Sequence, residues 1–293
     1  MKQIVIGFLG CGNVGGGVWE LLQGFAPQIA HRDQLSICVK KVLVRDVHKA
    51  RTCSVPQELL TTNPDDVLCD PEITLVAEFM GGEQPATDYL LRALENGKTV
   101  VTANKVAVAL NWHKLQAAAK AHLVGLYYEA SVCGAIPIIN ALMTPLQANN
   151  ITKLMGIING TTNYILSRMS AQGEPYEAVL ADAQRLGLAE PDPSSDVEGL
   201  DAAYKLSIMA SLAFHARVPF NKVYREGITH VTAMDISCGK EMGYVLKLLA
   251  IAKRDGNTIE VRVHPTFLPE KHPLATVDGS FNAVYLYGHA CKE

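Results

Sequence analysis

Short apolar runs alternate with stretches of helical apolar spacing through the first half of the chain, and this alternation predicts an α/β domain with a parallel sheet. The runs are apolar over most of their length, as is typical of strands that a parallel sheet buries on both faces. The expected strands are residues 3–9, 37–44, 73–79, 99–102 and 126–130. Helical spacing begins after the first run and returns at residues 87–96, where Gly97 is expected to end the helix.

The second half has a mixed pattern, in which strands and helices do not alternate regularly. We expect strands at residues 151–158, 228–235 and 258–267, a polar turn at residues 159–163, and helices at residues 138–147, 164–170, 176–186 and 242–253. The change in character, with a crossing point near residues 131–137, predicts two domains, residues 1–135 and residues 136–293. A chain of 293 residues is also long for a single core.

A stretch of acids and prolines, AEPDPSSDVEGLDAAYKLSIMA, occupies residues 189–210 and is the best candidate for a chemical centre. Pro191 and Pro193 restrict the backbone and keep the acids beside them out of a helix. Ser195 or Asp196 is expected to cap the helix that follows, in which apolar residues recur at helical spacing.

Asp201 and Lys205 are four residues apart on that helix, so their side chains share a face and can form an ion pair. An exposed pair would contribute only about 0.3–0.5 kcal/mol. Lys205 nevertheless lies in the run AAYKLSIMASLAF, which is apolar on nearly every side and leaves a solvated lysine little water. Because a buried lysine is costly unless it is paired, the spacing leaves open both a surface salt bridge and a functional lysine.

The first expected strand runs directly into GCGNVG at residues 10–15, a G-x-G-x-x-G motif followed by helical spacing. In a dinucleotide-binding fold such glycines allow a tight turn and a close approach of the backbone to a pyrophosphate at the helix N-terminus. The alternative is a glycine-rich turn that serves packing only. Strand, motif and helix occur in the required order, which favours nucleotide binding.

Two later strand ends also carry charged residues. After the second strand, an acid binds the ribose hydroxyls of NAD, whereas an arginine accommodates the 2′-phosphate of NADP. Arg45 precedes Asp46 at this point, which favours NADP. Lys105 follows the strand at residues 99–102, at the edge where ligands bind in open α/β sheets. It either faces cofactor and substrate or is a solvated loop residue.

Composition narrows the class of protein without identifying its chemistry. Hydrophobic residues make up 48% of the chain and the formal net charge is −3, as in ordinary soluble proteins with no nucleic-acid footprint. No apolar run reaches the roughly 18 to 20 residues of a membrane span, and no signal-peptide layout begins the chain. We therefore expect a cytoplasmic protein. The seven cysteines are an odd number without a Cys-x-x-Cys pair, which indicates reduced thiols and neither disulfides nor a zinc site.

The chain resembles the homoserine dehydrogenases over essentially its whole length. The segments that carry the resemblance are GFLGCGNVGGGV, VLVRD, VVTANK, EASVCGAIPII, GIINGTTNYIL, LGLAEPDPSSDVEGLDAAYKL and HPLATVDGSFNAV. The resemblance implies a Rossmann domain that binds NAD or NADP and a second α/β domain, with a mixed sheet, that binds the amino acid and mediates homodimerisation. It also implies reversible hydride transfer between L-homoserine and L-aspartate 4-semialdehyde, a step of threonine and methionine biosynthesis.

The resemblance also assigns roles to single residues. Lys205 is implied as the group that exchanges a proton with the substrate oxygen, with Lys105 close to both oxygen and cofactor and Asp201 holding Lys205. The implied substrate ligands are Glu190, whose charge suits an α-ammonium group, Asp196 and Thr161. The implied cofactor contacts are Gly10, Gly12, Asn13, Val14, Gly15, Arg45, Lys105 and Gly187. A structural monovalent cation, expected to be Na⁺, is implied at Glu129, Val132, Gly134 and Ile136, mainly on backbone oxygens.

Two departures from the family pattern bear on activity. Leu188 stands where many relatives carry an aromatic residue, so one substrate contact is expected to differ. The glycine- and proline-rich segment and closing helix expected after residue 293 are absent from this sequence, and so is a threonine-sensing regulatory domain. We expect a short form with a truncated C-terminal segment, and the alternative to an active dehydrogenase is a relative that binds nucleotide but catalyses little.

Overall fold

The computed structural model describes residues 2–290 and residue 292. The chain divides into two compact units, Met1–Ser131 and Val132–Glu293, here termed unit 1 and unit 2. The boundary expected after residue 135 is placed by the structure after Ser131.

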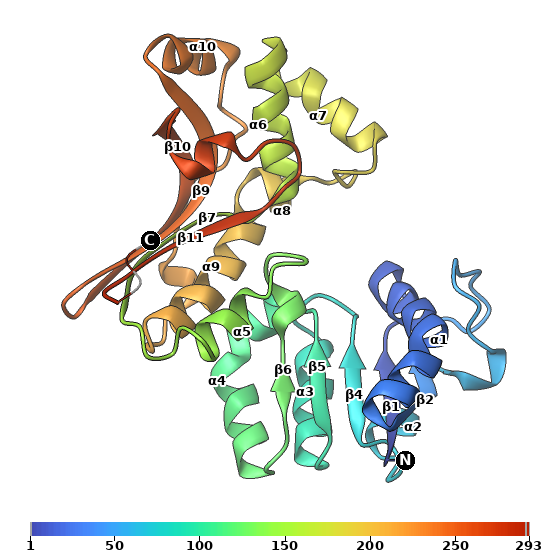
Figure 1. Ribbon diagram of the computed structural model, residues 1–293. Helices are drawn as coiled ribbons and strands as arrows, with labels where there is room; N and C mark the ends of the chain where they lie inside the picture. Colours follow the sequence, from blue (N-terminus) through green and yellow to red (C-terminus); the bar gives the residue numbers. More distant parts are fainter. Residues whose placement is uncertain (1, 291, 293) are drawn as a thin grey trace. The chain divides into compact units, whose positions relative to one another are not determined.

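Unit 1 is built on a six-stranded parallel sheet, which confirms the α/β expectation (Figure 1). The strand order β3-β2-β1-β4-β5-β6 is that of a doubly wound dinucleotide-binding fold. The strands are β1 (Lys2–Leu9), β2 (Leu35–Leu43), β3 (Leu60–Thr61), β4 (Leu75–Glu78), β5 (Thr99–Thr102) and β6 (Leu126–Tyr127). Because the order reverses between β1 and β4, a ligand crevice is expected at their carboxyl ends.

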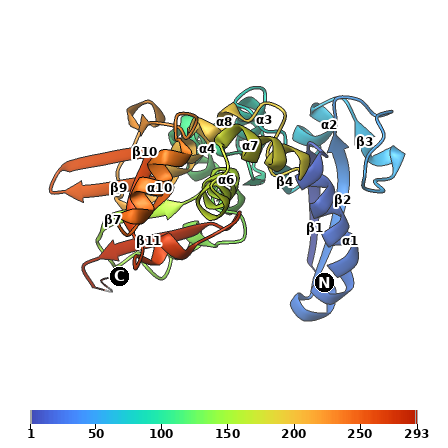
Figure 2. The ribbon, with the colours of Figure 1, turned by 90° about the horizontal axis from the view of Figure 1, so that it is seen from above.

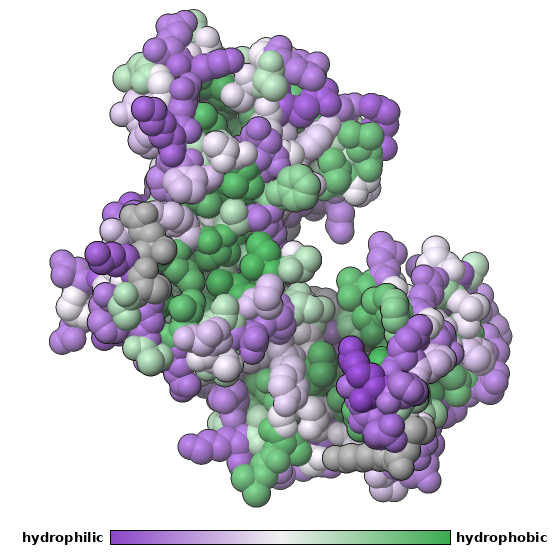
Figure 3. All heavy atoms as spheres, viewed as in Figure 1, coloured by the Kyte–Doolittle hydropathy of each residue, from purple (hydrophilic) through white to green (hydrophobic). Residues whose placement is uncertain are grey.

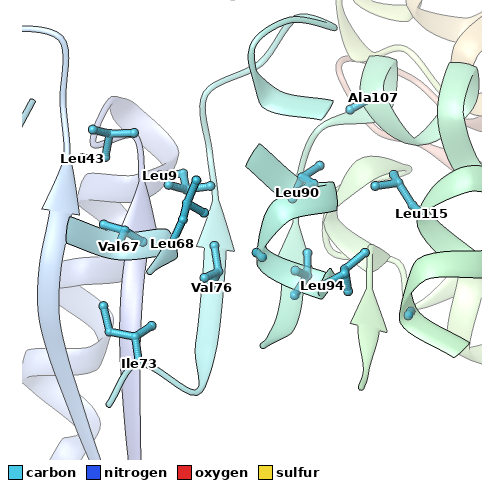
Figure 4. Packing of buried hydrophobic residues seen from close by; sticks show 13 residues of the cluster. Leu9, Leu43, Val67, Leu68, Ile73, Val76, Leu90, Leu94, Ala107 and Leu115 are labelled. Atoms are coloured by element: carbon cyan, nitrogen blue, oxygen red, sulfur yellow. The ribbon is translucent and has the colours of Figure 1, made fainter. Parts of the chain in front are cut away.

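Helices cover both faces of this sheet. Alternate residues of β1 face opposite sides, so Leu9 packs in one core with α3 and α4, while Phe8 packs in the other with Trp19 of α1. Figure 4 shows the first core, with Leu90 on α3 and Leu115 on α4. The helices are α1 (Asn13–Asp33), α2 (Asp65–Leu68), α3 (Ala86–Glu95) and α4 (Lys105–Ala121), with short 3₁₀ turns η1 (Gln57–Leu59) and η2 (Glu129–Ser131).

Unit 2 contains a five-stranded mixed sheet in the order β11-β7-β9-β10-β8. Its neighbours are antiparallel except for β10 and β8, which are parallel. The strands are β7 (Ile151–Ile157), β8 (Tyr224–Arg225), β9 (Tyr244–Asp255), β10 (Thr258–Pro269) and β11 (Ala283–Gly288). This sheet confirms a second α/β domain of mixed type.

The helices of unit 2 pack on its sheet, and two of them, α6 and α9, carry Thr161, Asp201 and Lys205. The longest, α9, packs on β7, β9 and β10, and α6 lies beside both β9 and α7 (Figure 2). The helices are α5 (Ile138–Met143), α6 (Gly160–Gln172), α7 (Tyr176–Arg185), α8 (Ser194–Val197), α9 (Leu200–Ala213) and α10 (Ala233–Glu241), with 3₁₀ turns η3 (Phe220–Lys222) and η4 (Pro273–Thr276).

Two elements expected in unit 2 were wrong in type. Residues 242–253, expected to be a helix, form most of strand β9, whose residues from 246 to 252 are all buried. A strand that is buried on both faces has no alternation to distinguish it from a buried helix. Residues 228–235, expected to be a strand, lead into α10, because Thr232 and Asp235 form a capping box that starts a helix.

Two helix starts also differ from expectation. The polar turn at residues 159–163 is mostly the first turn of α6, which begins at Gly160 with Asn159 as its N-cap. Helix α9 begins after Gly199, which has a left-handed backbone and no side-chain cap bond, so neither Ser195 nor Asp196 caps it. Those two residues lie in the short helix α8 instead.

Within the residues that the structure describes, no helix combines the length and the apolar character needed to cross a membrane.

Candidate active site

The glycine turn of unit 1, residues 10–15, connects β1 to α1 and is shaped by close backbone contacts. Gly10 has a φ of 99°, and a Cβ on it would lie 3.1 Å from the backbone of Phe79. A Cβ on Gly15 would lie 2.7 Å from the Gly10 carbonyl oxygen. A Cβ on Gly12 would have no neighbour within 4 Å, so this glycine borders open space. The turn therefore requires glycine at two positions for packing, and at the third it leaves room for a ligand.

The start of α1 suits an anion. Gly12 is the N-cap, Asn13 is the first helical residue and Val14 is 55% exposed. No acidic side chain lies in the first turn, and no side chain caps the helix. The first N–H groups and the positive end of a 21-residue helix dipole therefore favour a phosphate group at this turn. These residues fit the pyrophosphate of a dinucleotide.

Arg45 lies just beyond β2 and is exposed. The carboxylate of the next residue, Asp46, accepts a hydrogen bond from the His48 backbone N–H at 2.8 Å, and its carbonyl oxygen accepts one from Arg51. Asp46 is thus engaged in a local turn, while the Arg45 guanidinium reaches solvent near the end of the strand.

Lys105 is the first residue of α4, and a buried network fixes this helix end. Asn104 caps the helix by accepting from the backbone N–H groups of Val106 and Ala107, at 3.1 and 3.0 Å. Its amide nitrogen donates to the Gly82 carbonyl oxygen at 2.8 Å and, at 3.4 Å, to Glu78, which is fully buried. These contacts of Asn104 therefore fix the first residue of α4, Lys105, beyond the carboxyl end of β5.

In unit 2, Asp201 and Lys205 form a largely buried ion pair on α9. Their side chains are 3% and 16% exposed, and Lys205 Nζ lies 2.7 Å from Asp201 Oδ2. Nζ also donates to the Ile158 carbonyl oxygen at 2.9 Å. The pair is therefore not a surface salt bridge, and the burial of its ammonium is the property expected of a functional lysine.

A side chain that the sequence analysis had not assigned to the site, Asn159, joins this pair to a second acid. Its amide nitrogen donates to Asp196 Oδ1 at 2.7 Å and to Asp201 Oδ2 at 2.9 Å. Asn159 is 6% exposed and caps α6. The signal that could have identified it is the NGTTN sequence after a strand, because asparagine is among the best N-cap residues.

The other substrate ligands that the resemblance implied lie on two segments that touch. Thr161, in the first turn of α6, donates through Oγ1 to the Leu188 carbonyl oxygen at 2.8 Å. Gly187, with a φ of 73°, and the exposed Glu190 lie on the same segment as Leu188. The structure thus groups Thr161, Asp196, Asp201 and Lys205 around the α6 N-terminus, with Glu190 on the adjoining segment.

The implied cation ligands lie on the turn where unit 1 ends and unit 2 begins. Glu129 belongs to η2 of unit 1, and Val132, Gly134 and Ile136 belong to unit 2. Left-handed residues at Cys133 and Ala135 alternate with them and turn the backbone sharply. Across residues 2–290 and 292 no cluster of three or more His, Cys, Asp or Glu side chains could hold a metal.

A doubly wound domain with an open glycine turn and a second domain with a buried lysine–aspartate pair are what a nicotinamide-dependent oxidoreductase requires. Residues 10–129 match the family "Homoserine dehydrogenase, NAD binding domain", and residues 137–293 match "Homoserine dehydrogenase". The chain belongs to the homoserine dehydrogenase family, as the resemblance predicted.

Homoserine dehydrogenases from several organisms match this chain over nearly all of its length. The homoserine dehydrogenase of Bacillus subtilis is 48% identical over 293 residues, which are 100% of this chain and 68% of the relative. That of Synechocystis is 46% identical over 97% of this chain, which spans 66% of the relative. The crystal structure of a homoserine dehydrogenase from Thiobacillus denitrificans has a TM-score of 0.95 and 48% identity, covering 100% of this chain and 68% of that one. The chain thus spans about two thirds of the length of these relatives.

Cys11 of the glycine turn provides a test of the local packing. Its Sγ lies 3.5 Å from Sγ of the buried Cys53, and burial together with that hydrogen bond raises the pKa of Cys11 to about 11. Because only the thiolate is nucleophilic, we predict that iodoacetamide modifies Cys11 slowly at neutral pH and faster as the pH approaches 11. Exposed Cys38, Cys69 and Cys238 are the controls in peptide mass mapping. Cys11 modified as fast as these at neutral pH would contradict the packing.

Proposed function

We propose that this protein interconverts L-homoserine and L-aspartate 4-semialdehyde by hydride transfer with a nicotinamide cofactor, a step of threonine and methionine biosynthesis. The observation that carries the proposal is the buried Asp201–Lys205 pair at the end of β7, in a chain of this family. A lysine held at the edge of a polar site can exchange a proton with a substrate oxygen, which alcohol oxidation requires.

The chemistry divides between cofactor and protein. When bound, the nicotinamide takes the hydride from the hydroxyl-bearing carbon of homoserine or returns it to the aldehyde. As the C–H bond of the alcohol breaks, its O–H proton must leave, and we assign Lys205 Nζ, in its neutral amine form, as the group that takes it; in the reverse direction the ammonium form returns the proton to the substrate oxygen. Asp201 Oδ2 and the Ile158 carbonyl oxygen each accept a hydrogen bond from Nζ. This leaves the lone pair of the neutral amine, or the third N–H of the ammonium, for the substrate oxygen.

The substrate's charged ends are proposed to bind around the α6 N-terminus. The carboxylate of Glu190 suits the α-ammonium group, and Asp196 adds a second negative group nearby. Thr161 lies in the first helical turn, where backbone N–H groups and the positive end of the helix dipole favour the substrate carboxylate. We further propose that Lys105, at the start of α4, lies close to the reacting oxygen and the cofactor.

Three finer assignments are also proposals. Exposed Arg45 supports NADP(H) over NAD(H). Backbone oxygens of the turn at Val132, Gly134 and Ile136, with Glu129, are proposed to bind Na⁺ as a structural ion.

The third of these proposals is a homodimer formed through the unit 2 sheet. In Figure 3 apolar residues gather in the region where Figure 1 places β7 and β11, and β11 is an edge strand with an exposed Tyr287. The unpaired backbone N–H and C=O groups of an edge strand favour pairing with another chain. The cytoplasmic location remains a prediction.

The cofactor assignment gives the first test of this function. We predict that NADPH binds more tightly than NADH, and that Arg45→Ala narrows the difference by weakening NADPH binding while NADH binding hardly changes. Dissociation constants from fluorescence titration would show it, with Arg185→Ala as the control because Arg185 is an exposed arginine of unit 2. Equal affinities for the two cofactors in the unaltered protein would refute the preference.

The proton-transfer assignment gives the second test. Lys205→Met keeps the length of the side chain but cannot ionise, so turnover of L-homoserine should fall by roughly 10²–10⁴, the contribution expected of general acid-base catalysis. Affinity for NADPH should hardly change, because the expected nucleotide contacts lie mainly in unit 1. Lys240→Met, at an exposed position on α10, should leave turnover unaltered. If Lys205→Met turned over at nearly the parent rate, another group would have to move the proton.

A further inference from the structure

We propose that Asn159 is a positioning residue of the reaction, whose amide group holds Asp196 and Asp201 in place and thereby sets the position of Lys205. This inference rests on the function proposed above. It concerns a side chain that touches neither cofactor nor reacting atoms in that scheme, but that donates to Asp201, the ion-pair partner of the proton-transfer lysine, and to Asp196.

The orientation of the Asn159 amide is fixed by its other contacts. Its oxygen Oδ1 accepts from the Thr162 backbone N–H at 2.9 Å and from the Thr162 hydroxyl at 2.9 Å. Turning the amide over would point its NH₂ group at that backbone N–H and its oxygen at two carboxylates. Only one orientation is therefore compatible with the surroundings, and in it both amide protons are directed at the acids.

The acids need such a donor because of where they lie. Asp201 is 2% exposed, so a bond to its carboxylate acts in a medium of low polarity and is stronger than in water. Asp196 and Asp201 both approach the one amide nitrogen, at 2.7 and 2.9 Å, and two carboxylates this near each other repel. The NH₂ group places positive partial charge between them and fixes their separation.

Asn159 influences the position of Lys205 through one atom that both side chains contact, Asp201 Oδ2. Asp201 Oδ2 accepts from both Asn159 Nδ2 and Lys205 Nζ, so the amide and the ammonium together fix that oxygen. The residue before Asn159, Ile158, accepts from Nζ through its carbonyl oxygen. Two consecutive residues after β7 thus define where Nζ lies, one directly and one through the carboxylate.

A purely structural role for Asn159 makes a different prediction. Asparagine caps α6 in the ordinary way, and aspartate and serine cap helices about equally well. If capping were its only role, Asn159→Asp and Asn159→Ser would leave the enzyme stable and active. If the amide holds the two acids, Asn159→Asp replaces a donor with a third carboxylate and should be the more harmful of the two, while Asn159→Ser retains the cap but loses the paired donor.

The experiment measures kcat, KM for L-homoserine and NADPH affinity in the full chain. We expect kcat to fall about 10- to 100-fold in Asn159→Ser, the size of effect for losing a hydrogen bond to a charged group, and further in Asn159→Asp. NADPH affinity should stay unchanged in both. Thr232→Ala, which removes the cap of α10, is the matched control for loss of a helix cap and should leave kcat unaltered.

A double-mutant cycle separates positioning from general disturbance. If Asn159 acts through Asp201, Asn159→Ser should cost much less in an Asp201→Asn background than alone, because coupled residues are not additive. Additive losses, or parent-like kcat in both Asn159 variants, would overturn the proposal. Lys205→Met and the parent protein are measured alongside. An inactive Lys205→Met beside a fully active Asn159→Ser refutes only the positioning role, an active Lys205→Met refutes the assignment of Lys205 as the proton-transfer group, and a parent protein without homoserine turnover refutes the proposed function itself.

Discussion

The constraint on which the site depends is the burial of the Lys205 ammonium. A charge removed from water has to be compensated by a partner and hydrogen bonds, and here these are Asp201 one turn earlier and the Ile158 carbonyl oxygen. The carboxylate needs its own donors, which Asn159 supplies. The strand that ends at residue 157, the helix that begins at residue 160 and the start of α9 therefore have to meet at one point.

Each unit contains an asparagine that caps a helix and also donates a hydrogen bond to an acid. In unit 1 an asparagine stands two residues after β5, caps α4 and donates to the buried Glu78. In unit 2 an asparagine stands two residues after β7, caps α6 and donates to Asp196 and Asp201. Each amide uses its oxygen to start a helix and its nitrogen to fix an acid. Lys105 and Thr161, two residues proposed to contact the substrate or cofactor, are thereby held in the first turns of rigid helices.

Much of the first unit could be predicted from the sequence, because its parallel strands are short apolar runs and the glycine turn follows directly after β1. Residues 242–253 could not, since a strand buried on both faces has no period that separates it from a helix. The apolar neighbours of Lys205 favour its burial, but the sequence of one chain does not show that Ile158, forty-seven positions earlier, accepts a hydrogen bond from its Nζ. Asn159 was missed for the same reason: its local pattern indicates a turn, and its partners at 196 and 201 are brought to it only by folding.

If this buried network moves the proton while an amino-acid alcohol gives its hydride to a nicotinamide, reduced nicotinamide should form on reaction. The direct measurement is its absorbance when the purified protein is mixed with NADP⁺ and L-homoserine. We predict that NADPH forms in amounts set by the homoserine added, and that none forms when homoserine is omitted. A protein that binds NADPH tightly yet shows no homoserine-dependent reduction of either NADP⁺ or NAD⁺ would contradict the account, and would identify the chain as a nucleotide-binding relative without the activity.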